Sequence, residues 1–503
     1  MTEPYAPAGN ALWDEVVARG AMEAPAIRAP GGEVVRTHGA LRAAALARAA
    51  ELARLGVRPG DRVVAQVGRS PAAIELYLAA VAAGAIYVPL NEASVGAELD
   101  HFLRDAEPAL MVVDPVTRPG AETAAARAGV RLSDLAVQPP MGGFKPVDRG
   151  PEDVAAILYT SGTTGRPKGA MLTHDNLASN ARALAECWRW KASDVLLHAL
   201  PLFHTHGLFV ACNVTLRAGA SLLFLDRFDP RLVIEALEGA TTMMGVPTFY
   251  TRLLAEPGLD REACRGIRLF VSGSAPLLAE THRLFEERTG HRILERYGMT
   301  ECNMITSNPH DGERRPGTVG LALPGVALRV AHPDAEGIGE VELRGPNVTP
   351  GYWRNPDKTR ETFSPDGWFR TGDLGRIDGE GYLSIVGRLK DLVITGGYNV
   401  YPKEVELALD ALPDVDESAV FGLPDPDLGE LVAAAVVVRP GEGIDSNGLL
   451  EALAGRLARY KRPRRLWVVD ALPRNAMGKV QKAELRRRYT EATAAAGDGP
   501  GTF

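Results

Sequence analysis

The sequence predicts an α/β protein with a large N-terminal domain, in which helices cover parallel sheets, and a small C-terminal α/β domain. The 503 residues are too many for a single hydrophobic core, so at least two domains are expected. Residues 62–67 have the pattern of a strand, residues 72–83 that of a helix, and residues 86–88 that of a second strand. This βαβ order implies a parallel sheet with helices packed on it.

The C-terminal part has its own pattern of elements. Residues 432–438 and 466–469 resemble strands, and a helix is expected between residues 449 and 460. The segment is long enough for a separate small domain. Residues 131–152 contain one proline–proline pair, one glycine–glycine pair and few apolar residues, which predicts a loop.

The composition excludes several classes of protein. It is 46% hydrophobic and 24% charged, as in soluble globular proteins, and the net charge of −7 argues against nucleic-acid binding. The four cysteines form no Cys-x-x-Cys pair, and the N-terminus lacks the features of a signal peptide, so we expect a cytoplasmic protein. The longest apolar run, residues 76–90, is interrupted by Gly84 and Pro89, so no membrane span is expected.

The stretch from Thr160 to Gly169 reads Thr-Ser-Gly-Thr-Thr-Gly-Arg-Pro-Lys-Gly and follows a strand-like run, residues 154–159. Its glycines allow positive φ angles, and its hydroxyls, backbone N–H groups and cations suit a polyphosphate. It is not a Walker A loop, because Gly-x-x-x-x-Gly-Lys-Ser/Thr does not occur in the chain. Taken alone, the stretch is equally consistent with a solvated surface turn. A helix is expected after it, capped by Thr173 or Asp175.

The order Ser-Gly-Thr-Thr-Gly-x-Pro-Lys-Gly resembles the phosphate loop of the acyl-adenylate-forming superfamily, which includes acyl-CoA synthetases, luciferases and peptide-synthetase adenylation domains. The resemblance covers about residues 40–485, with the main motifs in order. It implies an adenylation domain at residues 1–389, a mobile domain at residues 390–503, and the use of ATP, Mg²⁺ and coenzyme A. The loop residues implied in ATP binding are Thr160, Ser161, Gly162, Thr163, Thr164, Gly165 and Lys168, with Thr160 and Lys168 also catalytic.

Two further runs, residues 271–276 and 295–301, resemble nucleotide-site signatures of the superfamily. By resemblance Tyr297 stacks on adenine, Thr300 reaches phosphate, and Glu301 holds Mg²⁺. An aromatic face suits a base, and a carboxylate is a hard ligand for a hard cation. The remaining residues implied to border the nucleotide are Ser274, Ala275, Pro276, Glu295, Arg296, Gly298 and Met299, and Ser274 also borders the substrate.

The run Leu200–Gly207 contains two histidines, His204 and His206. A metal site would need a third ligand that the sequence does not supply, and packed, hydrogen-bonded histidines are the commoner case. In the resembling family this motif lies beside the acyl pocket, which implies that His206 approaches the reacting carboxylate.

A helix is expected to start at Pro247 and to place Thr248 and Arg252 on one face. Without family context, Arg252 would be an exposed helical arginine. With it, the stretch resembles malonyl-CoA synthetases, whose acyl pocket holds a second carboxylate that a buried arginine could pair. The resemblance implies substrate binding by Thr205, His206, Arg252, Ser274 and Met304, with Arg283 a weaker candidate. For Met304, plain core packing is the commoner role.

Three later motifs complete the resemblance. Asp373 is implied to accept the ribose hydroxyls, although aspartate is also a common turn residue. Arg388 is implied to contact ribose or phosphate, and Lys390 or Asp391 to act as the hinge. Gly396 and Gly397 are implied to line the tunnel for the coenzyme A thiol.

Lys479 ends the run Pro473–Lys479 and would, read alone, be an exposed loop lysine. By resemblance it is the catalytic lysine of adenylation and a target of acetylation.

The sequence thus predicts an AMP-forming acid–thiol ligase for a small dicarboxylate, malonate or methylmalonate. The alternatives are a synthetase for short-chain or other acids and an adenylation enzyme that loads a carrier protein, although no carrier motif follows residue 485. A luciferase-like oxygenase and an inactive nucleotide-binding module rank lower, the latter because Lys479, Glu301 and Asp373 are all present.

Overall fold

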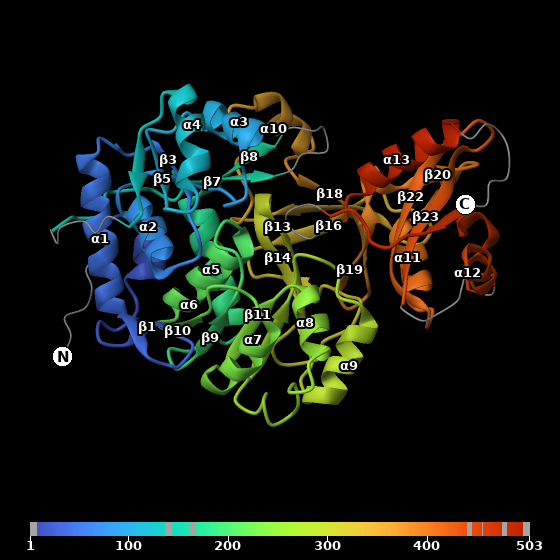
Figure 1. The fold of residues 1–503 in the computed structure, drawn as a ribbon, viewed down its shortest axis with the longest axis horizontal. Helices are drawn as coiled ribbons and strands as arrows, with labels where there is room; N and C mark the ends of the chain where they lie inside the picture. The colour runs from blue at the N-terminus through green and yellow to red at the C-terminus, as the bar shows by residue number, and fades with distance from the viewer. Residues whose placement is uncertain are drawn as a thin grey trace. The chain divides into compact units, whose positions relative to one another are not determined.

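A computed structural model describes residues 8–136, 143–160, 167–439, 445–454, 456–474 and 480–495. Its chain divides into two compact units (Figure 1). The first comprises residues 1–328, 343–369 and 378–383, and the second comprises residues 329–342, 370–377 and 384–503. The chain therefore crosses between the units several times before the expected hinge near Lys390. The domain boundary at residues 389 and 390 stays a prediction.

The first unit contains two mainly parallel sheets. The smaller has the order β6-β5-β3-β4-β7-β8 and is parallel except for the last pair. Its strands are Leu132–Asp134 (β6), Leu110–Val113 (β5), Arg62–Gln66 (β3), Ile86–Pro89 (β4), Val154–Thr160 (β7) and Lys168–Thr173 (β8). The expected βαβ unit is confirmed as β3, helix α2 (Pro71–Ala82) and β4. Strand β6 lies within the stretch predicted as a loop.

The larger sheet has the order β15-β14-β13-β12-β11-β9-β10-β1-β2, with parallel pairing from β13 to β1. Its strands are Leu321–Ala322 (β15), Asn303–Ser307 (β14), Leu294–Met299 (β13), Leu269–Ser272 (β12), Thr242–Gly245 (β11), Val195–His198 (β9), Ser221–Phe224 (β10), Pro25–Arg28 (β1) and Val34–Thr37 (β2).

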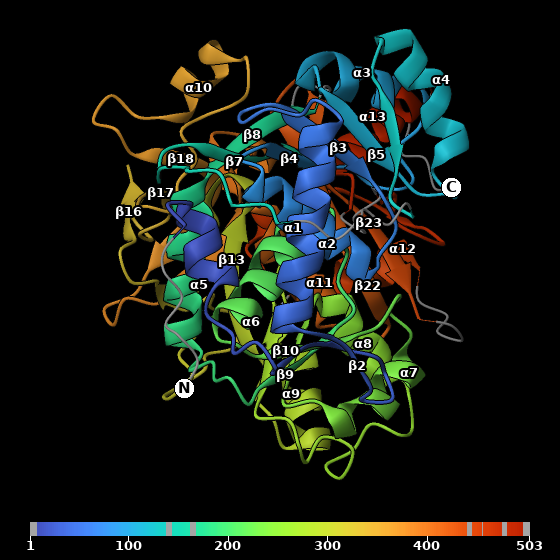
Figure 2. The same cartoon turned by 90° about the vertical axis from the view of Figure 1, so that its left-hand side faces the viewer.

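Helices form three layers around these sheets (Figures 1 and 2). Alternate residues of each strand face opposite sides: Val63 joins the core cluster between the sheets, whereas Val64 joins the cluster on the outer face of the smaller sheet. Both faces are buried, as expected of parallel sheets. The middle layer holds His38–Arg54 (α1), α2, His174–Cys187 (α5), His206–Cys212 (η2) and Asn213–Arg217 (α6); the outer layers hold Gly96–Ala106 (α3) and Arg118–Ala128 (α4), and Pro230–Ala236 (α7), Pro247–Leu254 (α8) and Ala279–Thr289 (α9). Short helices Trp13–Val17 (η1), Leu237–Gly239 (η3), Thr300–Cys302 (η4) and Pro356–Thr362 (α10) complete the unit.

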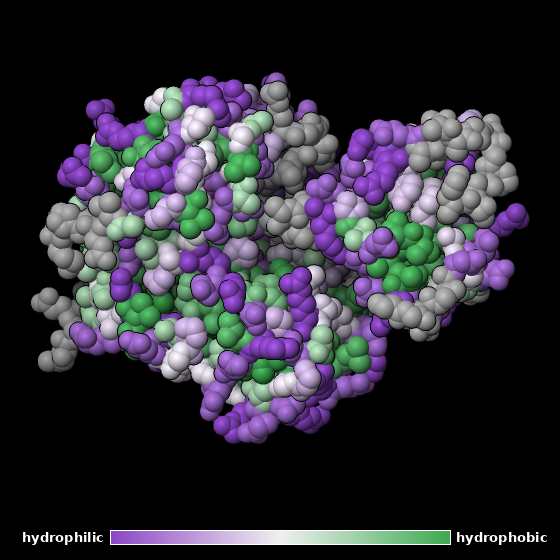
Figure 3. All heavy atoms as spheres, in the orientation of Figure 1, coloured by the Kyte–Doolittle hydropathy of each residue, from purple (hydrophilic) through white to green (hydrophobic). Residues whose placement is uncertain are grey.

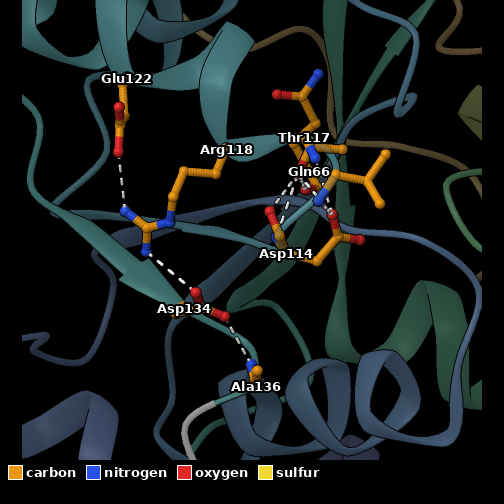
Figure 4. A network of polar contacts seen from close by, with 8 residues as sticks. Gln66, Asp114, Thr117, Arg118, Glu122, Asp134 and Ala136 are labelled. Carbon is orange, nitrogen blue, oxygen red and sulfur yellow. Dashed lines mark hydrogen bonds and ion pairs between the residues drawn. The ribbon is translucent and has the colours of Figure 1, made fainter.

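Side-chain hydrogen bonds fix the loops at the carboxyl edge of the smaller sheet (Figure 4). The Thr117 hydroxyl donates to the Gln66 carbonyl at 2.6 Å, and Asp114 accepts from the backbone N–H of Thr117 at 2.9 Å. Arg118 forms ion pairs with Glu122 and Asp134. These contacts tie the ends of β3, β5 and β6 together.

Helix α5 starts as the sequence predicts. The Thr173 hydroxyl accepts from the N–H of Asn176 at 3.1 Å, and the Asn176 side chain accepts from the N–H of Thr173 at 2.9 Å. This reciprocal capping box satisfies two N–H groups that the helix itself leaves unpaired. The first helical residue, His174, is thereby held in the core, where it is fully buried.

Because His174 is buried, we expect the protein to lose stability in acid. Burial lowers its pKa to about 4, whereas in the unfolded chain histidine titrates near 6.5. As the pH falls below about 6.5, His174 becomes protonated in the unfolded state but stays neutral in the folded state. The free energy of unfolding therefore decreases until the pH reaches about 4. By linkage, His174 alone should cost about 2 kcal/mol at pH 5 relative to pH 8.

The measurement is the free energy of unfolding in denaturant at pH 8 and pH 5. A His174→Asn variant is the comparison, because an asparagine oxygen can accept the Leu12 N–H that Nδ1 accepts. The variant should lose less stability between the two pH values. Equal losses of unfolding free energy in the parent and the variant would show that His174 is not the source of the pH dependence.

The second unit contains the other two sheets. One has the order β16-β17-β18-β19, with most of each strand in this unit; the other has the order β21-β20-β23-β22, with β24 also paired to β23. The strands are Ala327–Ala331 (β16), Gly339–Arg344 (β17), Phe369–Ile377 (β18), Leu383–Arg388 (β19), Val393–Thr395 (β20), Tyr398–Val400 (β21), Val415–Asp425 (β22), Gly429–Val438 (β23) and Arg465–Val468 (β24). The helices are Leu389–Asp391 (η5), Pro402–Asp410 (α11), Ser446–Ala452 (α12), Arg459–Lys461 (η6) and Lys482–Ala495 (α13). The helix expected over residues 449–460 is therefore wrong in extent, since α12 ends at Ala452.

Apolar side chains are scattered over the surface of the described residues. On the face drawn in Figure 3, hydrophilic and hydrophobic side chains are interspersed. Exposed large apolar side chains of the described residues, such as Val95, Leu232 and Tyr398, come from separate elements. In the part of the chain that the structure describes, no helix is long and apolar enough to cross a membrane.

Candidate active site

The candidate site lies in the first unit, at the carboxyl ends of the larger sheet's central strands. Strands β11 and β12 are parallel neighbours that end at Gly245 and Ser272, and Ser272 pairs with Glu295 of β13. In open parallel sheets this edge is where ligands bind. The loop that follows β12 carries Ser274, Ala275 and Pro276, and β13 itself carries the predicted nucleotide residues from Glu295 to Met299.

His206 is held at this edge by a neighbouring loop. It is 5% exposed, and its Nδ1 lies 3.3 Å from Oγ of Ser274. Burial, followed by the positive charge of nearby Arg296, holds the pKa of His206 well below 6.5, so the ring is neutral at physiological pH. Its Nε2 is buried and has no hydrogen-bond partner among the described residues.

Arg296 is buried against the same loop. It is 2% exposed, and a methyl group built on the Gly273 α-carbon would lie 2.5 Å from the Cζ atom of Arg296. The guanidinium therefore lies directly on the glycine, and no side chain fits at position 273 while Arg296 keeps this position. Burial lowers the pKa of Arg296 to about 9, which leaves it positively charged at neutral pH.

This guanidinium has no anionic partner in the described residues. Its Nε and Nη2 atoms are buried without hydrogen bonds. The same holds for Oγ1 of Thr205, which precedes His206, and for Oγ of Ser272, which precedes Gly273. We call Thr205, His206, Ser272 and Arg296 the polar cluster. Buried donors of this kind are normally satisfied, so their common lack of partners indicates a place for a polar ligand.

The two arginines expected near the substrate, Arg252 and Arg283, are both exposed. Arg252 is exposed on α8, and Arg283 is exposed on α9, where it pairs with Glu280 at 2.6 Å and Glu287 at 2.5 Å. The substrate-binding role expected of Arg283 stays a prediction. The arginine that the fold buries beside His206 is one that the sequence placed at the nucleotide.

The residues expected around the nucleotide lie along β13 and its neighbours. Glu295 accepts the N–H of Leu277 at 3.2 Å, which fixes the loop that carries exposed Ala275 and Pro276. Tyr297 is half-buried, and Gly298, Met299 and Thr300 follow it into η4. A side chain at Gly298 would lie 2.1 Å from the Asn303 carbonyl oxygen, so this hairpin requires glycine there.

Glu301 and Lys168 lie within electrostatic reach of each other. Glu301 is buried and accepts the Tyr352 hydroxyl at 2.9 Å. Burial and the nearby charge of Lys358 lower the pKa of Lys168, whereas Glu301 acts in the opposite direction. Lys168 starts β8, opposite Thr160 at the end of β7. The residues between them that were predicted to bind phosphate, Ser161, Gly162, Thr163, Thr164 and Gly165, lie outside the described residues.

In the described part of the chain, no group of three His, Cys, Asp or Glu side chains could hold a metal ion. A nucleotide-borne Mg²⁺ does not need such a group, because it takes one or two carboxylates with phosphate oxygens and water. The single carboxylate of Glu301 fits that kind of site.

Met304 is 2% exposed and belongs to the core between the two sheets. Its backbone N–H donates to the Asn180 side chain at 3.2 Å, and its carbonyl accepts from Asn180 at 2.8 Å. Strand β14, in which Met304 lies, packs against η2, which starts with His206. This position is compatible with the predicted floor of the acyl pocket.

The remaining predicted residues lie in the second unit. Asp373 is buried in β18 and forms an ion pair of 2.9 Å with Arg388, whereas Lys390 is exposed in η5. Gly396 and Gly397, with φ of 55° and 81°, form the two-residue turn between β20 and β21. Positive φ at both positions is what a tight hairpin turn requires. Lys479 lies outside the described residues.

Two protein-family models match this chain. The AMP-binding enzyme model matches residues 14–353, and the model of the AMP-binding enzyme C-terminal domain matches residues 404–479. The chain belongs to the AMP-binding enzyme family. The expected fold class and the expected enzyme class, an AMP-forming acid–thiol ligase, are thereby confirmed. ATP and coenzyme A are substrates of the CoA ligases in this family.

Three proteins illustrate the similarity of this AMP-binding enzyme to known members. A feruloyl-CoA synthase from an Amycolatopsis species is 38% identical over 498 residues, which cover 96% of this chain and 99% of the relative. A malonate–CoA ligase from Arabidopsis thaliana is 38% identical over 452 residues, covering 80% and 74%. The crystal structure of ATP-bound MatB from Rhodopseudomonas palustris has 50% identity and a TM-score of 0.92, covering 96% and 99%.

Proposed function

We propose that this AMP-binding enzyme is a malonyl-CoA synthetase that also accepts methylmalonate and acts through an acyl-AMP intermediate. The observation that carries the proposal is the buried, unpaired guanidinium of Arg296 beside His206. A substrate with two carboxylates can place one at the reacting position and pair the other with this cation. The Arabidopsis malonate–CoA ligase supports the same choice.

Arg296 also provides the basis for selectivity. Acetate or a fatty acid would leave the buried guanidinium without a partner, and an unsatisfied buried polar group costs about 1–3 kcal/mol, or more when it is charged. Buried Thr205 and Met304 would limit the size of the group on the central carbon. Arg252, which is exposed on α8, is retained only as a second candidate for the same carboxylate.

In the first half-reaction, one substrate carboxylate attacks the α-phosphate of ATP and pyrophosphate leaves. Neutral His206 would orient that carboxylate, while Lys168, Thr160 and the loop between them would neutralise charge on the phosphates. Lys479 would act on the same charge from the C-terminal domain. Mg²⁺ would be held by Glu301 and would shield the phosphate charge; catalysis here is positioning and electrostatics.

In the second half-reaction, the thiol of coenzyme A attacks the acyl-adenylate and AMP leaves. We propose that the C-terminal domain rotates about Lys390 between the two steps, so that Lys479 leaves the site and the Gly396–Gly397 turn lines the thiol path. Asp373 would accept the ribose hydroxyls, and Arg388, its partner in the unliganded chain, would contact ribose or phosphate. Acetylation of Lys479 and a cytoplasmic location stay predictions from the sequence.

The test is coenzyme A-dependent AMP formation from ATP with malonate, methylmalonate, acetate, a medium-chain fatty acid and ferulate. Turnover with the two diacids and little with the other acids is expected. Preferred turnover of acetate, fatty acid or ferulate would support the ligase activity but contradict the proposed dicarboxylate substrate. Activity only with an added carrier protein would instead identify a free-standing adenylation enzyme.

A further inference from the structure

Asn303 is a buried polar residue that no sequence motif singled out. It is 1% exposed, and neither its Oδ1 nor its Nδ2 atom has a hydrogen-bond partner in the part of the chain that the structure describes. An asparagine amide offers two donors and one acceptor oxygen. Leaving all of them unpaired in the interior is unfavourable, so the amide is expected to receive a partner from outside the chain.

The backbone at Asn303 is also in an unusual conformation. Its φ of 47° and ψ of −128° lie outside the regions that non-glycine residues normally adopt. Two of the described non-glycine residues with positive φ, Ser274 and Asn303, belong to this site. Strained backbone of this kind persists only where its surroundings hold it, and it concentrates at ligand-binding positions.

The neighbours of Asn303 provide the necessary restraint. Asn347 donates to the carbonyls of Cys302 at 2.7 Å and Met304 at 3.0 Å. Asn180 holds both backbone groups of Met304. The residues on either side are therefore fixed by side-chain hydrogen bonds, while the Asn303 amide itself takes no part in holding the fold.

The position of Asn303 relates it to the polar cluster. It pairs with Met299 in the hairpin formed by β13 and β14, and β13 also carries Arg296. Strand β14, which starts at Asn303, packs against η2, which starts at His206. Two of the elements that supply the polar cluster thus flank this residue.

We propose that Asn303 is a specificity-determining residue whose Nδ2 donates a hydrogen bond to the non-reacting carboxylate of the substrate. This inference rests on the proposed function. Arg296 can engage a carboxylate through its two free N–H groups, Nε and Nη2, which leaves acceptor sites on the same oxygens. A neutral amide fills such a site without adding a second buried charge.

The test uses two substitutions of Asn303. Asn303→Gly removes the amide and suits the positive φ, so the variant should fold at least as well as the parent. Asn303→Asp keeps the size but places a negative charge against the substrate carboxylate. His332→Gly is the matched control, because exposed His332 has the same φ of 47°.

The expected result is a selective loss of diacid turnover. Asn303→Gly should lower kcat/KM for malonate about 10- to 100-fold, as expected for a lost hydrogen bond to a charged group, and Asn303→Asp should lower it further. In both variants KM for ATP and the slow turnover of propionate should change less than about two-fold, within the range of an unaffected site. His332→Gly should behave as the parent enzyme.

Two outcomes would overturn the role of Asn303 while leaving the proposed function intact. One is wild-type malonate turnover by Asn303→Gly, and the other is an equal loss with malonate and propionate, which would indicate packing or an enclosed water. A parent enzyme that is inactive on malonate would overturn the proposed function, and this inference with it.

Discussion

Replacing Arg296 with methionine is expected to lower kcat/KM for malonate by about 100- to 1,000-fold, because two charge-assisted hydrogen bonds to the substrate would be lost. Turnover of propionate should fall much less or rise, since the apolar side chain no longer requires an anionic partner. Steady-state AMP formation with the two acids measures this change in preference directly.

The same substitution is expected to stabilise the ligand-free protein. Arg296 is 2% exposed and has no anionic partner among the described residues. Removing an uncompensated buried charge in favour of an apolar side chain of similar length should raise the free energy of unfolding by about 1 kcal/mol or more. Denaturant unfolding without substrate provides this measurement. Lower activity combined with higher stability would separate a substrate-binding role from a structural one.

Arg252 supplies the comparison. If Arg296 holds the second carboxylate, Arg252→Ala should change kcat/KM for malonate less than about three-fold, as expected of an exposed side chain. If instead Arg252→Ala lost malonate turnover and left ATP binding intact, the arginine expected from the sequence would be the right one. Equal losses of malonate and ATP affinity in the Arg296 variant would contradict the assignment of Arg296.

Replacing Lys479 with alanine is the second substitution with a large expected effect. Loss of one positioned charge on the phosphates should slow adenylation about 100- to 1,000-fold. Formation of malonyl-CoA from preformed malonyl-adenylate and coenzyme A should change by less than about five-fold, because no pyrophosphate leaves in that step. Malonate-dependent exchange of labelled pyrophosphate into ATP measures the first half-reaction, and thioester formation measures the second.

Exposed Lys145 gives a matched control for this experiment, and Lys145→Ala should retain both half-reactions. Similar slowing of both steps by Lys479→Ala would argue against a lysine that acts only in adenylation. An unchanged exchange rate would remove Lys479 from the catalytic residues altogether.

Local sequence patterns predicted individual elements because those elements depend on nearby residues. Thr173 caps α5, and the apolar run after Asp153 forms β7, as expected. The loop predicted around residues 131–152 contains β6 because pairing with β5, a distant partner, makes a strand of weakly apolar residues. Residues after Ala452 do not continue α12, although their composition favours a helix.

Motifs predict which residues belong to the site, but they do not show which of these residues the fold buries. The run Glu295–Glu301 is recognisable as a unit, yet nothing in it distinguishes the buried Arg296 from a nucleotide contact. That distinction depends on the close approach of Gly273, which lies in the loop after β12. Asn303 carries no sequence signal because its importance lies in a positive φ and in unpaired atoms. Helical spacing predicts the face on which Arg252 lies, but it does not predict that this side chain is exposed.

The contact between Gly273 and Arg296 restricts how this enzyme can evolve. A larger residue at position 273 collides with the guanidinium, so it requires the Arg296 side chain either to shift or to be replaced. Mutations at the two positions are therefore epistatic, and their order matters. A lineage that first loses the arginine can accept larger residues at position 273, and these residues then disfavour a return to arginine at position 296. Directed-evolution libraries that aim at new acids should vary the two codons together.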